Sequence, residues 1–186
     1  MSIILASQSP RRKQLLEWAE IDFEVIVAPT EETYPDNLSL EEIPIYIAKQ
    51  KALAVEQKTG KEKIIVAADT VVVLNNKIIG KPKNREDAIK ILSDLSGNEH
   101  CVITGVVILS ANKQIAFADT TYVQFHALTQ EQIIFYVDKY KPYDKAGAYA
   151  IQEWIGVIGI QSIQGDFYNV MGLPVSKVVQ ALNSLK

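Results

Sequence analysis

The sequence is poor in the residues that carry most metal, redox and covalent chemistry. It has one cysteine and two histidines in 186 residues, which excludes an internal disulfide framework and leaves too few ligands for a Cys/His zinc site. Cys101 begins an apolar segment, where a buried, unreactive thiol is expected. His100 and His126 have no partner at metal-ligand spacing. A metal in this protein is therefore expected to be held by oxygen ligands, which suit Mg²⁺ or Mn²⁺ better than zinc.

Long apolar runs and an excess of basic residues are also absent. No apolar run is long enough to span a bilayer, and the N-terminal residues lack the basic lead-in of a signal peptide. The formal net charge of −3 disfavours a surface for nucleic acids. We therefore expect a cytoplasmic protein without membrane or nucleic-acid partners. Its length predicts a single domain over residues 1–186, either undivided or with two tightly packed lobes, and no segment has the composition of a separable linker.

The apolar pattern predicts strands and helices interspersed along the chain. Apolar, β-branched runs predict strands at residues 3–6, 23–27, 64–74, 77–80, 102–109, 115–125 and 155–163. Helical spacing and capping residues predict helices at residues 10–20, 44–58, 85–95, 129–140 and 174–185. Two of the turns are expected at Asn75–Asn76 and near Asn112–Lys113. Because several of the strands are joined as hairpins, this order indicates an α/β or α+β fold around a mixed sheet.

The helix that begins near Pro10 carries its charges in the reverse of the stabilising order. Arg11 and Arg12 lie in its first turn, whereas Glu17 and Glu20 lie near its end. Each exposed cation at a helix N-terminus opposes the helix dipole by about 0.3–1 kcal/mol. A phosphate group bound at this terminus would remove the conflict. The alternative is that both arginines point into water and the helix tolerates the cost.

Two charged residues interrupt otherwise apolar patterns. Asp69, followed by Thr70, lies within the apolar run 64–74. Such a carboxylate must be paired, bind a metal, or lie at a strand end or bulge that faces a cleft. Lys51 lies on the apolar stripe of its helix, between Ile47 and Val55. It either reaches a functional site or extends to the rim of the core with its charge in water.

Three further positions are weaker candidates. Glu32, next to Glu31 in a loop, is a possible metal ligand, although adjacent loop acids are usually just solvated. Lys81 follows a predicted hairpin, and Gln152 ends a segment of small residues that lets backbone approach a ligand. The sequence contains no P-loop, no dinucleotide-binding glycine fingerprint and no nucleophile elbow.

Taken in order, these segments resemble the Maf family of nucleoside triphosphate pyrophosphatases. One motif alone would be a weak signal, but the ordered series runs through nearly the whole chain. It comprises Glu32 and the segments Leu5–Arg12, Ala48–Ala52, Ala67–Val72, Lys81–Pro82, Thr104–Val106, Lys145–Gln152, Ile163–Asp166 and Gly172–Pro174. The resemblance implies hydrolysis between the α and β phosphates, giving a nucleoside monophosphate and pyrophosphate. It also implies a divalent metal, Mg²⁺ or Mn²⁺, and a homodimer. The implied fold is inosine-triphosphatase-like, with a bent mixed sheet and two lobes around a deep nucleotide cleft.

The resemblance also implies roles for individual residues. Asp69 is the expected general base and shares the metal with Glu32. The residues expected to hold the triphosphate are Ser9, Arg11, Arg12, Lys51 and Lys81.

Substrate preference is expected to depend on three positions. Arg12, Thr70 and Gln152 look like the family group that prefers dTTP and UTP, with modified pyrimidine nucleotides as further candidates. One alternative is the sister group that prefers 7-methyl-GTP. Another is a nucleotide-binding regulator of cell division with little turnover, but the presence of Asp69 and Lys51 favours the enzyme.

Overall fold

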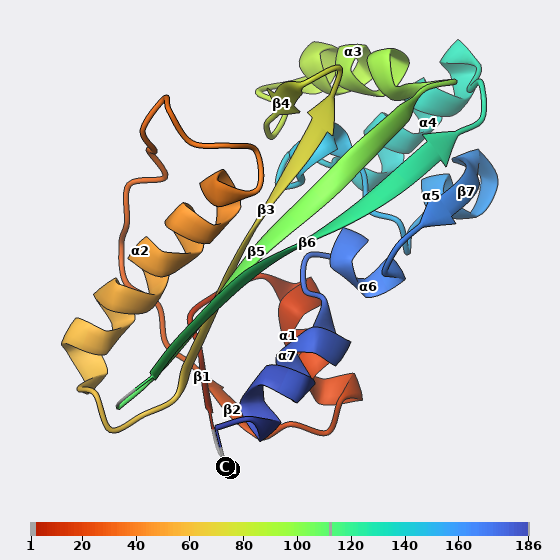
Figure 1. Cartoon of the computed structure of the whole chain (residues 1–186). Coiled ribbons are helices and arrows are strands. Elements are labelled where there is room, and N and C mark those ends of the chain that lie inside the picture. Colours follow the sequence, from red (N-terminus) through yellow and green to blue (C-terminus); the bar gives the residue numbers. More distant parts are fainter. Residues whose placement is uncertain (1–2, 112, 186) are drawn as a thin grey trace. The chain divides into compact units, whose positions relative to one another are not determined.

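The computed structural model describes residues 3–111 and 113–185. The described strands form a seven-stranded sheet in the order β2-β1-β3-β5-β6-β7, and β4 pairs with β3 (Figure 1). The strands are β1 (Ile3–Leu5), β2 (Phe23–Val25), β3 (Ile65–Leu74), β4 (Lys77–Ile79), β5 (Glu99–Ser110), β6 (Lys113–Phe125) and β7 (Ile160–Gln164). β1 is parallel to β2 and β3, whereas the β3–β4 and β6–β7 pairs are antiparallel. The predicted mixed sheet with flanking helices is therefore confirmed.

The chain divides into two compact units. The first comprises residues 1–70, 104–119 and 172–186, and the second comprises residues 71–103 and 120–171. Strands β3, β5 and β6 each begin in one unit and end in the other. Among the described residues, no helix has the length and apolar character that a bilayer-spanning segment needs.

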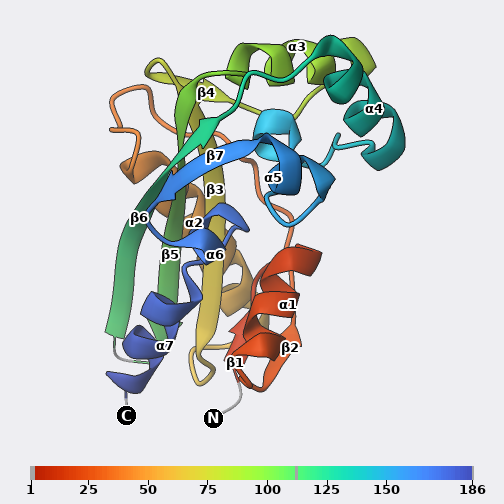
Figure 2. The same cartoon turned by 90° about the vertical axis from the view of Figure 1, so that its right-hand side faces the viewer.

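In the first unit, helices cover both faces of the sheet. Helix α2 lies on one face, and α1 and α7 lie on the other, as Figures 1 and 2 both show. These helices are α1 (Pro10–Trp18), α2 (Glu42–Thr59) and α7 (Val175–Asn183). Ala48, Ala52 and Val55 of α2 pack into a buried cluster with apolar residues of β1, β3 and β5. Burial of this face fixes α2 against the strands.

Gly105 of β5 makes the close packing of α2 possible. A Cβ atom at this position would lie 2.2 Å from the backbone nitrogen of Ile45 and 2.3 Å from the carbonyl carbon of Pro44. Both contacts are backbone atoms, so a rotamer change cannot relieve them. Only glycine lets the start of α2 approach the strand this closely.

We predict that Gly105→Ala lowers the free energy of unfolding by about 1–3 kcal/mol or more, because the added methyl group overpacks two backbone segments. Urea denaturation of the two proteins measures the difference. Gly80→Ala is the matched control, since a Cβ atom there meets nothing within 4 Å. Equal loss of stability in both variants would contradict the packing argument.

The second unit contains further helical segments beside its own parts of the strands. They are α3 (Arg85–Leu95), α4 (Gln130–Tyr140), the 3-10 turn η1 (Ala146–Ala148), α5 (Trp154–Gly159) and α6 (Phe167–Val170). α3 packs against α4. Inside this unit, the rings of His100, Phe125 and Tyr149 meet edge to face with centroids 5.0–5.5 Å apart.

Local sequence signals agree closely with the structure where capping residues or turns set the boundaries. Thr129 and Gln132 form a reciprocal capping box at the start of α4, where the sequence predicts that a helix begins. Asn75 and Asn76 both adopt the left-handed conformation, with φ of 51° and 61°, and form the tight turn between β3 and β4. The other predicted turn includes residue 112, which lies outside the described residues.

The predicted strand over residues 155–163 is wrong in its first half. Residues Trp154–Gly159 form the helix α5, and only Ile160–Gln164 form a strand. Apolar β-branched residues favour a strand locally, but packing decides differently here. Gly156 lies so close to the carbonyl oxygen of Ile151 that a Cβ atom would be 1.7 Å from it. The compact helical turn thus depends on a close backbone contact with Ile151, five residues earlier in the chain, that the apolar pattern does not reveal.

Burial of His100 makes the stability of this protein depend on pH. His100 is 2% exposed, and its Nε2 shares a 2.7 Å hydrogen bond with the hydroxyl of Tyr149. Burial lowers the pKa of His100 from 6.5 to about 4, whereas burial raises the pKa of Tyr149, so both groups are neutral at pH 7. Between pH 6.5 and 4 the unfolded chain therefore binds a proton that the folded chain does not.

We predict that this protein loses about 3 kcal/mol of stability through His100 as the pH falls from 6.5 to about 4. His100→Gln keeps an acceptor for Tyr149 but cannot titrate, so its stability should fall less over this range. Urea denaturation at pH 7, 5.5 and 4.5 measures both slopes. The same slope for both proteins would show that His100 is not the responsible group.

Candidate active site

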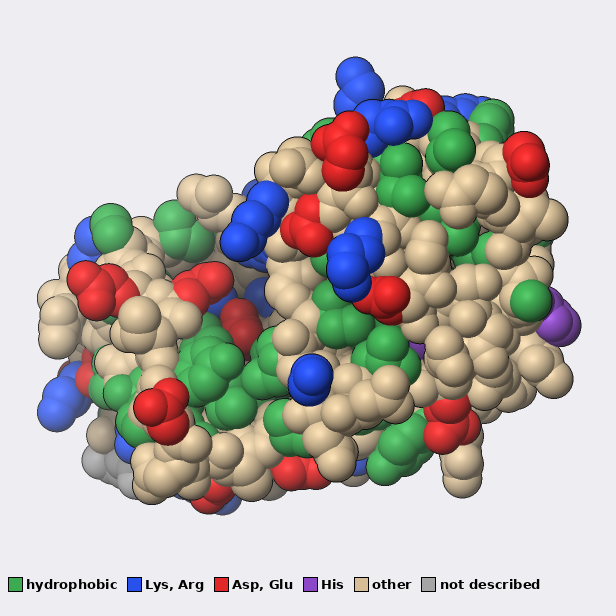
Figure 3. Space-filling model, turned by 90° about the horizontal axis from the view of Figure 1, so that it is seen from above, with side chains coloured by type: hydrophobic (Ala, Val, Ile, Leu, Met, Phe, Trp, Pro, Cys, Tyr) green, Lys and Arg blue, Asp and Glu red, His purple; other side chains and the backbone are tan. Residues whose placement is uncertain are grey.

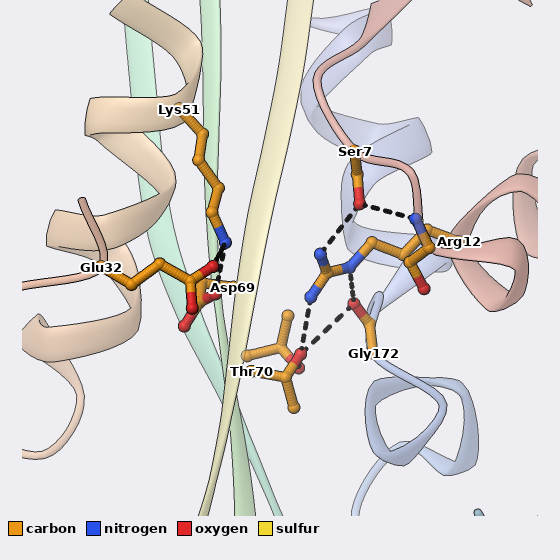
Figure 4. Close-up of polar contacts among 9 residues, drawn as sticks. Ser7, Arg12, Glu32, Lys51, Asp69, Thr70 and Gly172 are labelled. Atoms are coloured by element: carbon orange, nitrogen blue, oxygen red, sulfur yellow. Dashed lines mark hydrogen bonds and ion pairs between the residues drawn. The ribbon is translucent and has the colours of Figure 1, made fainter. Parts of the chain in front are cut away.

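A lysine and two carboxylates meet on one face of β3. The Lys51 ammonium lies 2.8 Å from Oε1 of Glu32 and 2.7 Å from Oδ1 of Asp69 (Figure 4). Lys51 comes from α2, Asp69 from the middle of β3, and Glu32 from the segment before α2. The side chains of Lys51 and Asp69 are only 17% and 14% exposed. Of the three alternatives for Asp69, the structure shows pairing, with Lys51 as the partner. The Lys51 charge is held by two carboxylates and does not extend only into water.

A second group of polar contacts surrounds Arg12. Its Nε donates to the carbonyl oxygen of Gly172 at 2.7 Å, NH1 donates to Oγ of Ser7 at 3.1 Å, and NH2 donates to Oγ1 of Thr70 at 3.0 Å. The Thr70 hydroxyl also shares a 2.9 Å hydrogen bond with the buried hydroxyl of Thr104. Arg12 is 8% exposed. The alternative in which both arginines point into water is therefore wrong for Arg12.

The two groups meet at adjacent residues of β3. Successive side chains of a strand point to opposite faces, so Asp69 is directed toward α2 while Thr70 is directed toward α1. Figure 4 shows the Lys51 group and the Arg12 group on either side of the strand. The structure thus brings together most of the residues that the sequence selects in the first unit.

The Arg12 guanidinium keeps its charge despite its burial. Desolvation lowers its pKa to about 10, and the nearby positive charge of Arg11 acts in the same direction. The negative charges of Asp69 and Glu32 partly offset this effect. Because a pKa of about 10 lies well above neutral pH, Arg12 is a fixed cation that lies near enough to both carboxylates to be stabilised by their negative charge.

The start of α1 offers a further donor for an anion. Ser9 occupies the N-cap position, but its side chain makes no capping hydrogen bond, and its backbone N–H donates to Ser7 Oγ at 3.2 Å. The Nε of Arg11 is buried without a hydrogen-bond partner among the described residues. A buried, unpaired N–H is costly, so an acceptor supplied by a ligand would stabilise this arrangement.

The remaining selected residues, Lys81 and Gln152, belong to the second unit. Both are exposed, Lys81 between β4 and α3, and Gln152 just before α5. The segment around Gln152 is held by a network that sequence reasoning missed. The Tyr136 hydroxyl donates to Glu153 and accepts from the backbone N–H of Ala150, and Lys145 lies 3.6 Å from Glu153.

The carboxylates of the first unit fit a divalent metal of the hard, oxygen-preferring kind. In residues 3–111 and 113–185 no group of three or more His, Cys, Asp or Glu side chains is suited to hold a metal. Glu32 and Asp69 nevertheless direct two carboxylate oxygens at the same ammonium. Mg²⁺ commonly binds through one or two carboxylates together with substrate phosphates and water. Two carboxylates are thus part of a Mg²⁺ ligand set that substrate phosphate oxygens and water would complete.

Comparison with known proteins agrees with the resemblance. The Maf-like protein family matches residues 2–185. This chain belongs to the Maf family. A protein from Parabacteroides distasonis named dTTP/UTP pyrophosphatase is 50% identical over 181 residues, which is 97% of this chain and 94% of that protein. A Cytophaga hutchinsonii protein of the same name is 51% identical over 98% of this chain and 84% of its own length.

A solved structure supports the fold of this Maf protein. The structure of the Staphylococcus aureus Ham1 protein covers 100% of both chains with a TM-score of 0.57. The sequence identity is 20%, so this likeness supports the fold and not the activity.

Sequence reasoning missed the acceptors that hold Arg12 in this Maf protein. Ser7, Thr104 and Gly172 lie in segments that resemble family motifs, but no role was assigned to them. Ser7 is the one with a local signal, because it lies in the turn before α1, only five residues before Arg12. Gly172 is 160 residues from Arg12, and no local pattern links the two.

We predict that Arg12→Lys lowers the free energy of unfolding by about 1–3 kcal/mol. One ammonium cannot reproduce the three fixed N–H directions of the guanidinium, so buried acceptors lose their partners. Urea denaturation measures the change. The control is Arg85→Lys, at an exposed pair with Asp138, which should change stability by less than about 1 kcal/mol. An Arg12→Lys protein as stable as this control would contradict the structural role.

Proposed function

We propose that this protein hydrolyses dTTP and UTP to the nucleoside monophosphate and pyrophosphate. The observation that carries the proposal is the identity of about half of all residues, over nearly the whole chain, with proteins named dTTP/UTP pyrophosphatase. The paired carboxylates and the buried cations of the first unit are consistent with it. The names of these relatives do not favour the 7-methyl-GTP alternative.

The cations of the site would hold the triphosphate. Arg11 has a buried Nε without a partner among the described residues, and Lys51 carries an ammonium beside the two carboxylates. Arg12 adds a fixed charge and keeps the turn at Ser9 in place through Ser7. We assign Lys81 to the same task from its place in the family motif. Positive charge at these positions offsets the charge that develops on the leaving pyrophosphate.

Asp69 is the general base in this proposal. Its Oδ1 accepts from Lys51, and its Oδ2 has no hydrogen bond within the described ranges, which leaves Oδ2 to receive a proton. Water would add to phosphorus while its proton passes to Asp69, and the bridging P–O bond would break with its electron pair on pyrophosphate. Atoms and charge balance without a covalent enzyme intermediate.

A divalent metal would be held by Glu32 and Asp69. Mg²⁺ or Mn²⁺ bound there supplies positive charge that stabilises the oxygens of the triphosphate. Asp69 then has two tasks that compete, because metal ligation lowers the basicity of a carboxylate. Glu32, which is half exposed, has no such second task.

Thr70 and Gln152 are the proposed specificity residues, together with Arg12. An amide both donates and accepts hydrogen bonds and so matches the edge of a pyrimidine, which has O4, N3–H and O2. Thr70 is held in one orientation by Arg12 and Thr104. Gln152 is exposed next to a segment that Tyr136 and Glu153 keep in place.

The cellular setting follows from the family. We propose a cytoplasmic enzyme that acts as a homodimer on free nucleotides, without nucleic-acid or membrane partners. Acidic and basic side chains are interspersed over the face seen in Figure 3. That distribution does not resemble the basic stripe of a nucleic-acid-binding protein.

The experiment that tests the function is pyrophosphate release from a panel of nucleotides, with and without Mg²⁺ or Mn²⁺. We expect release from dTTP and UTP that depends on the metal. Preferential release from 7-methyl-GTP would overturn the proposed substrate. No release from any nucleotide would overturn the enzyme and favour the regulator.

We predict that Asp69→Asn lowers kcat for dTTP by about 10²–10⁴-fold, because a carboxamide cannot accept the proton of the attacking water. Steady-state assays measure turnover, and calorimetry measures dTTP binding, which should persist. Asp94→Asn is the control, because Asp94 is exposed and pairs with Lys90 on α3. Turnover near that of the original protein would exclude Asp69 as the base.

A further inference from the structure

The Lys51 ammonium occupies the position between the two carboxylates that are best suited to a metal. Its distances of 2.8 Å to Glu32 and 2.7 Å to Asp69 are those of direct charged hydrogen bonds. The ammonium and a divalent cation therefore compete for the same two carboxylates. Because both are positive, they cannot share this space, and binding of one must displace the other.

Lysine is well suited to such a displacement, whereas the other cation of the site is not. The ammonium sits at the end of a flexible four-carbon stem, and the Lys51 side chain retains 17% exposure. Arg12 is instead held by three hydrogen bonds to buried or partly buried acceptors. The backbone of α2 is fixed by its buried face and by the close contact at Gly105. Only the end of the Lys51 side chain needs to move.

We propose that Lys51 is an exchangeable counter-ion. In the free protein it neutralises Glu32 and Asp69 and keeps the affinity for free divalent metal low. When metal and triphosphate arrive together, the metal takes the two carboxylates and the Lys51 ammonium moves to phosphate oxygens. The location of the metal rests on the proposed function, but the exchange itself is a separate claim about how this site binds ions.

The exchange couples the binding of metal to the binding of phosphate. The Lys51 ammonium loses two ion pairs when it leaves the carboxylates, and contacts with phosphate oxygens compensate this loss. Bound phosphate therefore favours the binding of metal, and bound metal favours the binding of phosphate. By linkage, the two ligands raise each other's affinity by the same factor. The site would thus select metal–nucleotide complexes over free metal ions.

The direct test is titration of the protein with Mn²⁺ alone, in which electron paramagnetic resonance measures the concentration of free Mn²⁺ and hence the affinity. Lys51→Met should bind Mn²⁺ at least tenfold more tightly than the original protein, because no ammonium competes. Lys58→Met is the matched control on the same helix, since Lys58 is exposed and donates to the carbonyl of Val27; it should bind as the original protein does. Equal or weaker binding by Lys51→Met would overturn the proposal.

A double variant locates the ion. Adding Glu32→Gln to Lys51→Met should abolish the gain in affinity, because one of the two carboxylates is lost. A gain that persists in the double variant would place the ion elsewhere and overturn the exchange.

A second measurement uses the unsubstituted protein and does not depend on any variant folding. Acetylation of lysines by acetic anhydride, followed by mass spectrometry, reports how accessible each ammonium is. Mn²⁺ at a concentration that saturates the original protein in the titration should raise the labelling rate of Lys51 at least threefold and leave that of Lys58 unchanged. An unchanged rate at Lys51 would overturn the exchange.

Neither measurement involves turnover, so the outcomes separate the two proposals. Exchange without hydrolysis of any nucleotide would contradict the proposed function alone. Hydrolysis of dTTP without exchange would contradict the role of Lys51 alone.

Discussion

The buried guanidinium of Arg12 joins segments of the first unit that are far apart in the sequence. It binds Ser7 in the turn after β1, Thr70 on β3, and Gly172 before α7. Burying a charge is unfavourable unless hydrogen bonds and opposite charges compensate it. Three acceptors and the nearby carboxylates of Asp69 and Glu32 provide this compensation. The turn before α1, the middle of β3 and the start of the last segment are therefore fixed by one side chain.

The alternation of side chains along β3 then distributes the chemistry. Asp69 faces α2 and meets Lys51, whereas Thr70 faces α1 and meets Arg12. A proton acceptor and a candidate specificity residue are thus adjacent in sequence but lie in separate polar groups. Exchange of Lys51 would change the ion pairs of the Asp69 group and leave the hydrogen bonds of the Arg12 group in place, since Lys51 pairs with Glu32 and Asp69 alone among these residues.

The agreement between sequence and structure is best where a signal is local. Capping residues set the start of α4, a pair of asparagines forms the β3–β4 turn, and apolar spacing gives α2 and α3. The exception is residues 155–163, where β-branched residues predict a strand and Gly156 packs into a helical turn against Ile151. Local propensity is weak compared with packing of this kind.

The sequence by itself determined the family, most of the helices and strands, and the positions of the unusual charges. Asp69 in an apolar strand and Lys51 on an apolar stripe are visible without a structure, because unpaired charges are disfavoured in such positions. Only the tertiary structure decided their partners: that Lys51 binds both carboxylates, and that Gly172, 160 residues away, accepts from Arg12. The physical reason is that hydrogen bonds between distant segments depend on how helices and strands pack. Periodicity and capping describe each element alone and do not encode that packing.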